Sequence, residues 1–197
     1  MRSIGITGGV GSGKSVVLDY LRDHYGARLI VADEVAHYLE EPGEACYNEL
    51  LELLGKEVLG VDGYFDNKKF AAAIFSDEKK LAAVNAIVHP EVKKYILSEM
   101  EKEERKGCRY FVVEAALLIE EHYDEVLDEL WYIYVPEETR RDRLKASRGY
   151  SDKKIDSIFA VQLPEQEFRS HCRYVIDNSG ELPETYRQID GLIRQQW

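Results

Sequence analysis

The sequence predicts an α/β fold in which a parallel sheet of five strands is flanked by helices. Five short apolar runs indicate buried strands, at residues 3–7, 28–32, 110–113, 130–135 and 174–176. Helical patterns fill most of the intervals, and strands that alternate with helices are typical of a parallel sheet covered on both faces. The chain has 197 residues, which favours a single domain over residues 1–197.

The first strand is followed by glycines and then by a helix. Val17, Leu18, Leu21 and Tyr25 form one apolar stripe within residues 14–25, and Gly26 follows as a C-cap. This spacing predicts a helix that packs its stripe on the sheet.

Residues 8–15, GGVGSGKS, match the phosphate-loop motif G-x-x-x-x-G-K-[ST]. The glycines let the backbone form a nest whose N–H groups point at phosphate oxygens, and the helix adds the positive end of its dipole. Lys14 would neutralise the β and γ phosphates, and the Ser15 hydroxyl would ligate Mg²⁺. We therefore predict a P-loop NTPase-type nucleotide site made of Gly9, Val10, Gly11, Ser12, Gly13, Lys14, Ser15 and Val16.

The interval over residues 33–109 is too long to be a crossover helix alone. Helical patterns cover residues 45–54, 68–75 and 79–106, with a turn at residues 60–63. We expect a helical insertion that projects from the carboxyl edge of the sheet.

The composition excludes several classes of function. With 26 Lys plus Arg against 37 Asp plus Glu, the net charge is −11. This charge argues against broad binding to nucleic acids and against binding to an anionic membrane surface. The three cysteines are far apart and form no CxxC, which favours a reducing compartment over disulfides or zinc. No run approaches ~18 apolar residues. We expect a cytoplasmic protein that is a monomer or a weak homo-oligomer.

A basic segment stands out in this acidic chain. Residues 139–148, TRRDRLKASR, hold five basic residues and one acidic residue. Such a run is often a solvated helix face, but its clustering here favours a lid over residues 137–162 that closes on ATP. Its candidate phosphate-contacting side chains are Arg140, Arg143 and Arg148.

Three classes of phosphate-loop protein are possible: a small-molecule kinase, a GTPase-like switch, and a nucleotide-driven motor. A switch needs Asn-Lys-x-Asp, but residues 67–70 are NKKF and lack the aspartate. Nothing positive supports a motor. A kinase needs a base, and Asp33 follows the second strand, where it could take the proton of an attacking hydroxyl. Taken alone, Asp33 is more typical of a helix N-cap.

Several segments, in order along almost the whole chain, resemble dephospho-CoA kinases. IGITGGVGSGKS resembles the opening of that family, and residues 32–36 are similar to its ADxxA segment. Residues 84–92 resemble LNxIxHPxV and residues 117–120 resemble the end of PLLFE. Residues 136–143, Gln162 and the VIDN of residues 175–178 are similar to the lid helix, the glutamine after it and the family's terminal segment.

The resemblance implies transfer of the ATP γ-phosphate to the ribose 3′-hydroxyl of dephospho-CoA, giving CoA and ADP with Mg²⁺. It gives Asp33 the position of the base, with Lys14 and Arg143 beside it as catalytic groups. The insertion becomes the acceptor-binding part, and the acceptor residues implied are Asp33, His89, Leu117 and Glu120. Arg140, Arg148 and Asn178 are implied as ATP contacts.

The chain departs from the family pattern at a few positions. The family usually has glutamine where Arg140 stands and threonine where Val16 stands, and Arg148 is displaced by one position from the usual arginine. Asn67 replaces a frequent arginine in the insertion. The alternative from a different class is an ATP-binding switch or scaffold without acceptor chemistry.

Overall fold

The computed structural model describes residues 1–75 and 77–195, and the chain divides into two compact units. Met1–Leu29 and Glu103–Trp197 form the first unit, and Ile30–Lys102 forms the second. Each unit is built around its own buried apolar residues.

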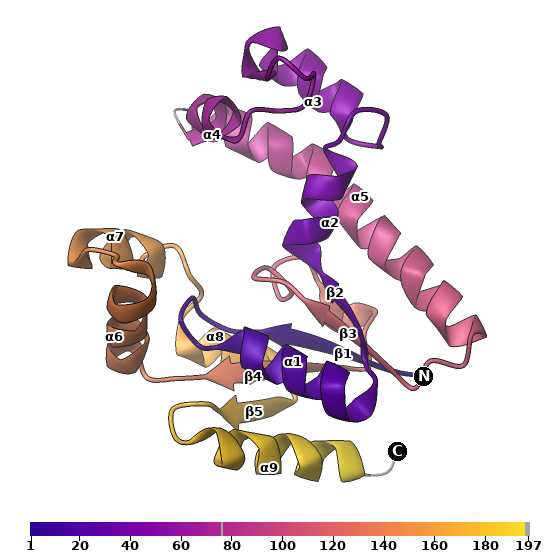
Figure 1. The fold of residues 1–197 in the computed structure, drawn as a ribbon, viewed down its shortest axis with the longest axis vertical. Coiled ribbons are helices and arrows are strands. Elements are labelled where there is room, and N and C mark those ends of the chain that lie inside the picture. The colour runs from indigo at the N-terminus through magenta and orange to yellow at the C-terminus, as the bar shows by residue number, and fades with distance from the viewer. Residues whose placement is uncertain (76, 196–197) are drawn as a thin grey trace. The chain divides into compact units, whose positions relative to one another are not determined.

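The first unit is built on the five-stranded parallel sheet that the sequence predicts. In chain order the strands are β1 (Arg2–Thr7), β2 (Arg28–Val31), β3 (Tyr110–Glu114), β4 (Glu129–Tyr134) and β5 (Tyr174–Asp177). They lie side by side in the order β2-β3-β1-β4-β5, and β1 pairs in parallel with both β3 and β4 (Figure 1). The fold class predicted from the apolar runs is confirmed.

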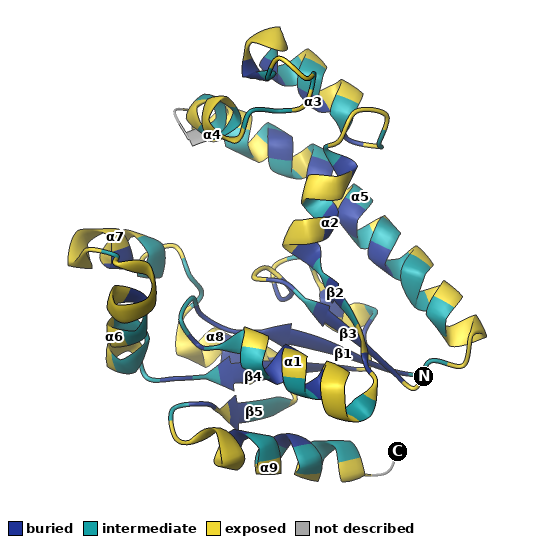
Figure 2. Cartoon of the chain, in the orientation of Figure 1, coloured by how far each residue is buried: buried dark blue, intermediate teal, exposed yellow. Residues whose placement is uncertain are grey.

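Two helices, α1 (Lys14–Tyr25) and α9 (Leu182–Arg194), pack on one face of this sheet (Figure 1). The predicted stripe of α1 is buried there, since Val17 and Leu21 are fully buried against the strands. Trp131 of β4 belongs to the same cluster, and Figure 2 shows the strands as the most buried part of this unit. The apolar runs thus form strands because both of their faces are covered.

The opposite face of the sheet is packed by residues that follow β3 and by α8 (Glu165–His171). Gly5 of β1 faces Leu118, Leu127 and Leu130 so closely that a Cβ atom there would clash with the Leu130 side chain. The rings of Tyr132 and Phe168 stack in parallel with their centroids 4.7 Å apart. A side chain larger than glycine at position 5 would therefore force Leu118, Leu127 and Leu130 away from β1. The short 3₁₀ helix η2 (Tyr123–Glu125) precedes β4.

The second unit is helical, as the sequence predicts for this stretch. Its elements are α2 (Ala32–Leu39), α3 (Tyr47–Leu54), the 3₁₀ helix η1 (Lys56–Val58), α4 (Asn67–Phe75) and α5 (Glu78–Arg105), which continues into the first unit.

The long helix α5 buries one residue per turn, because Val84, Val88, Val92 and Ile96 recur at a spacing of four. The ring of Tyr95 in α5 packs on the ring of Tyr38 in α2, with centroids 5.7 Å apart.

Element boundaries differ from the sequence predictions by a residue or two. Ala32 begins α2 instead of ending β2, since the carboxylates of Asp33 and Glu34 suit the first turn of a helix. Pro90 lies inside α5. His89 is therefore in mid-helix, within the helical stretch that the sequence predicts over residues 79–106.

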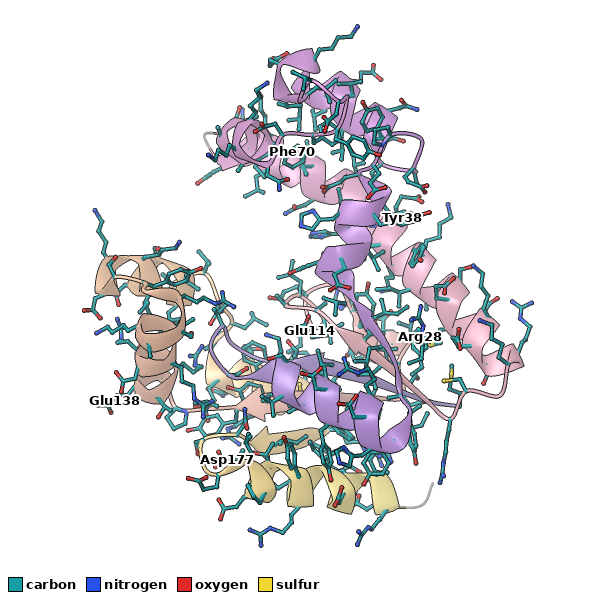
Figure 3. The ribbon with its side chains drawn as sticks, in the orientation of Figure 1. Arg28, Tyr38, Phe70, Glu114, Glu138 and Asp177 are labelled. Carbon is teal, nitrogen blue, oxygen red and sulfur yellow. The ribbon has the colours of Figure 1, made fainter. Side chains whose placement is uncertain are left out.

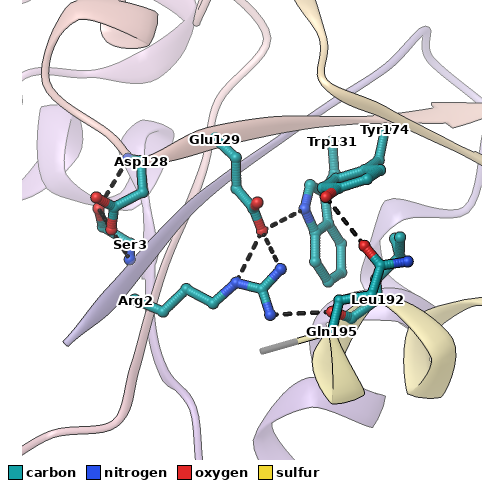
Figure 4. Close-up of polar contacts among 8 residues, drawn as sticks. All are labelled: Arg2, Ser3, Asp128, Glu129, Trp131, Tyr174, Leu192 and Gln195. Carbon is teal, nitrogen blue, oxygen red and sulfur yellow. Dashed lines mark hydrogen bonds and ion pairs between the residues drawn. The ribbon is translucent and has the colours of Figure 1, made fainter. Parts of the chain in front are cut away.

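A buried ion pair joins the starts of β1 and β4, and its arginine also bonds to α9 (Figure 4). Arg2 Nη2 lies 2.8 Å from Glu129 Oε1, and both side chains are less than one-tenth exposed. Trp131 Nε1 donates to the same oxygen at 2.8 Å, and Arg2 Nη1 donates to Leu192 O at 3.0 Å. The charges tolerate burial because they are paired and hydrogen-bonded.

None of the helices within the described residues combines the length and the apolar character that crossing a membrane requires.

Replacing Asp190 by asparagine is expected to lower the free energy of unfolding at pH 7 by about 1 kcal/mol. Asp190 of α9 accepts hydrogen bonds from Tyr25 at 2.6 Å and Tyr20 at 2.9 Å, and the bond from Tyr25 is the main cause that lowers the pKa of Asp190 below its usual value. A carboxyl group with a lowered pKa stabilises the fold above its unfolded pKa of about 4, and this contribution is lost as the pH falls further.

Urea unfolding of the chain and of D190N at pH 7 and pH 3 measures this effect, and the difference between the two proteins should shrink at pH 3. A difference that stays constant with pH would show that the charge of Asp190 does not contribute.

Candidate functional site

The phosphate loop connects β1 to α1 and has the backbone shape that its glycines predict. Gly11 and Gly13 have φ angles of 86° and 79°, in the left-handed region that residues with a side chain rarely adopt. Gly13 is also the N-cap residue of α1, so the loop ends on the positive end of the helix dipole. The loop is thus shaped for an anion.

Lys14 reaches back across the loop to its first residue. Its Nζ donates to Gly8 O at 2.9 Å and lies 3.4 Å from Glu114 Oε1, and the Lys14 and Glu114 side chains are both less than one-fifth exposed. Glu114 is the last residue of β3 (Figure 3), so the carboxylate faces the loop rather than bulk water. The two charges balance each other at the carboxyl edge of the sheet.

The two residues after Lys14 differ in what they can offer a ligand. Ser15 is exposed in the first turn of α1, where its hydroxyl is accessible. Val16 is half-buried, and its amide donates to Gly13 O at 3.1 Å.

The predicted lid region contains two helices, α6 (Glu137–Arg148) and α7 (Asp152–Phe159). Two of the five basic residues in the run are held by acids of α7. Arg141 lies 2.7 Å from Asp156 and 3.2 Å from Asp152, and Lys145 lies 2.7 Å from Asp152. The contact with Lys145 is the main cause that lowers the pKa of Asp152. These two cations therefore join α6 to α7.

Arg140 contacts the phosphate loop directly. Its Nη1 lies 3.4 Å from Val10 O and 3.0 Å from Gln162 Oε1, and its guanidinium stacks over Phe159 at 4.4 Å. The same side chain lines a cavity of about 260 Å³ together with Gly9 and Gln162. Three of the predicted site residues, Gly9, Val10 and Arg140, are thus in one place.

Arg143 is brought to the loop by the segment after β5. Its Nη2 donates to Asn178 O at 2.9 Å, and Asn178 Nδ2 donates to Ser12 O at 2.7 Å. Arg148 is exposed, and its guanidinium lies 5.8 Å from the Tyr150 ring. The structure therefore joins Arg143 and Asn178 to the loop and places Arg148 beside Tyr150.

Four predicted acceptor residues are divided between the units. Asp33 and His89 belong to the second unit, where Asp33 is exposed in the first turn of α2 and His89 is half-buried in α5. The N-cap residue of α2 is Val31, so the alternative in which Asp33 caps this helix is wrong. Leu117 and Glu120 are exposed in the turns that follow β3 in the first unit.

Sequence reasoning missed one residue of this site. Thr185 of α9 is completely buried, and its hydroxyl donates to Asn178 Oδ1 at 2.9 Å. A threonine in the first turns of a helix gives no signal of its own, and only its place a few residues after the VIDN segment points to it.

Comparison with known proteins identifies the family. The family model of dephospho-CoA kinases matches residues 2–184. A dephospho-CoA kinase from Carboxydothermus hydrogenoformans is 36% identical over 98% of this chain and 93% of its own length, and one from Aquifex aeolicus is 35% identical over 99% and 97%. The solved structure of TT1252 from Thermus thermophilus has a TM-score of 0.83 at 31% identity, covering 100% of this chain and 98% of that one. The chain belongs to the dephospho-CoA kinase family.

Proposed function

We propose that this chain transfers the γ-phosphoryl group of ATP to the ribose 3′-hydroxyl of dephospho-CoA and releases CoA and ADP. Membership of the family gives it dephospho-CoA kinase activity, the final step of coenzyme A biosynthesis. The observation that carries the proposal is the phosphate loop between β1 and α1 with Lys14 folded across it. The family match supplies the acceptor.

The residues of the loop suit ATP and Mg²⁺. The glycine nest and the start of α1 offer N–H groups to the phosphates, and the Ser12 hydroxyl is buried without a hydrogen-bond partner among the described residues. The exposed hydroxyl of Ser15 is an oxygen ligand of the kind that Mg²⁺ prefers. When bound, the metal ion neutralises charge on the β and γ phosphates.

Phosphoryl transfer of this type depends on position and electrostatics more than on covalent chemistry. Asp33 accepts the proton of the 3′-hydroxyl while the hydroxyl oxygen bonds to the γ-phosphorus. The bond between the γ-phosphorus and the bridging oxygen breaks, and that oxygen leaves with ADP. Lys14 and Arg143 stabilise the charge on the transferring oxygens, with Arg140 beside the loop. Residues 33–109 hold the acceptor, and residues 137–162 act as the lid.

In this proposal the chain has two small-molecule substrates, ATP and dephospho-CoA, and binds neither nucleic acid nor a membrane. It acts in the cytoplasm as a monomer or a weak homo-oligomer.

Release of ADP should depend on the acceptor. With MgATP and dephospho-CoA we expect one CoA for each ADP, because phosphoryl transfer couples the two products. CoA is the matched control acceptor, since its 3′-hydroxyl is already phosphorylated, and it should release almost no ADP. Hydrolysis of ATP at the same rate with and without dephospho-CoA would instead favour a switch or scaffold.

A further inference from the structure

A chain of buried hydrogen bonds runs from α9 to the phosphate loop. The Thr185 hydroxyl donates to Asn178 Oδ1 at 2.9 Å, and Asn178 Nδ2 donates to Ser12 O at 2.7 Å. Thr185 is fully buried and Asn178 is 3% exposed, so water does not compete for these bonds. Thr185 of α9 therefore holds the phosphate loop in place through the Asn178 amide.

The bonding pattern determines which way the Asn178 amide faces. The carbonyl oxygen of Ser12 can only accept a hydrogen bond, so the nitrogen of the Asn178 amide must face it. Thr185 supplies a donor to the amide oxygen at the other end. Without that hydroxyl the amide oxygen would be buried without its donor, which is unfavourable.

The Asn178 amide also determines the direction of an N–H group in the loop. Within a trans peptide the C=O and the following N–H point in opposite directions, so holding the Ser12 carbonyl toward Asn178 turns the Gly13 N–H away from it. A Cβ atom on Gly13 would lie 2.6 Å from Asn178 Nδ2, which shows how closely the amide is packed on the loop. N–H groups oriented in this way form the anion-binding nest.

Asn178 holds a second group through its main chain, because its carbonyl oxygen accepts from Arg143 Nη2 at 2.9 Å. One residue thus connects the loop, the end of β5 and an arginine of α6.

We propose that Thr185 is a positioning residue for ATP. Its hydroxyl fixes the orientation of the Asn178 amide, which turns the Gly13 N–H toward the phosphates. Neither the Thr185 nor the Asn178 side chain has to touch the nucleotide. The proposal rests on the proposed function only in taking ATP as the ligand of the loop.

The test compares Thr185→Val, Thr185→Ser and Tyr20→Phe. Valine keeps the shape and removes the hydroxyl, serine restores the hydroxyl, and Y20F removes a different hydrogen bond to α9, the one to Asp190 at 2.9 Å. The probe is the Mg²⁺ complex of the non-hydrolysable ATP analogue AMPPNP, with affinity measured by calorimetry. This measurement needs no acceptor, so it does not depend on dephospho-CoA being the substrate.

We expect T185V to weaken AMPPNP binding about tenfold, as loss of one buried hydrogen bond predicts. T185S and Y20F should stay within about twofold of the parent chain, since the donor is restored or the loop is untouched. In turnover, T185V should raise the KM for ATP and leave the KM for dephospho-CoA unchanged. Asn178→Ala, which removes the donor without changing α9, should weaken AMPPNP at least as much and serves if T185V does not fold.

Two results would overturn the proposal. One is a folded T185V that binds AMPPNP as tightly as the parent chain. The other is an equal loss in T185V and T185S, because the cause would then be the shape of the side chain rather than its hydroxyl.

Discussion

Asparagine in place of Asp33 should lower the rate of phosphoryl transfer by about two to four orders of magnitude, the usual contribution of a general base. Asparagine has the same shape but cannot take up the proton of the 3′-hydroxyl. The affinity for MgATP should change little, because D33N leaves every residue of the phosphate loop unchanged. Single-turnover phosphorylation of dephospho-CoA, followed by rapid quench, measures the chemical step itself.

Glu34 offers a matched control, since it is the next residue, exposed in the same first turn of α2. E34Q removes the same charge from the same helix terminus and should react at nearly the parent rate. A single-turnover rate in D33N equal to that of the parent would exclude Asp33 as the base. Equal losses in D33N and E34Q would point to the charge of the helix terminus instead.

Lys14→Ala should remove most of the thermal stabilisation that MgATP gives the chain. The variant removes the cation at the loop and leaves Glu114, 3.4 Å from Lys14 Nζ in the parent, to repel the phosphates. At an ATP concentration of 100 times Kd the parent gains about 2.7 kcal/mol, whereas a hundredfold weaker variant gains only about 0.4 kcal/mol. Thermal unfolding with and without MgATP reports the difference.

Arg22→Ala is the control for Lys14→Ala, because Arg22 lies in the last turn of the same helix, paired with Asp19 and Asp23. It should keep the full shift with MgATP. If K14A were stabilised as much as the parent chain, Lys14 would not contact the phosphates.

The sheet could be predicted from the sequence because its strands are buried on both faces and therefore appear as apolar runs. The exceptions are two buried charges, Arg2 and Glu129, which begin β1 and β4. They are partners far apart in the sequence, and no local pattern shows which buried charge will be neutralised by which distant residue. The sequence therefore predicts the start of each strand one residue late.

The candidate site likewise combines features that a local sequence pattern predicts with features that depend on partners distant in the sequence. The position and backbone shape of the phosphate loop could be predicted, because its motif places glycines, a lysine and a hydroxyl at fixed spacing between a strand and a helix. The basic run indicated a lid but not which cations are available, since Arg141 and Lys145 are held by acids beyond the turn at Gly149. Thr185 acts through a hydrogen bond to Asn178, and a single threonine in a helix carries no pattern.

The ion pairs between α6 and α7 bear on the entropy that the proposed lid would lose on closing over ATP. Arg141 meets Asp152 and Asp156, and its guanidinium also lies 5.5 Å from the Phe159 ring, so one side chain is already restrained on three sides. Ordering such a long side chain during ligand binding would cost about 1.5–2 kcal/mol of rotamer entropy. Because these ion pairs join α6 to α7 before ATP arrives, we expect the two helices to move together on closure, with the loss of freedom falling on the segments that connect them to β4 and α8.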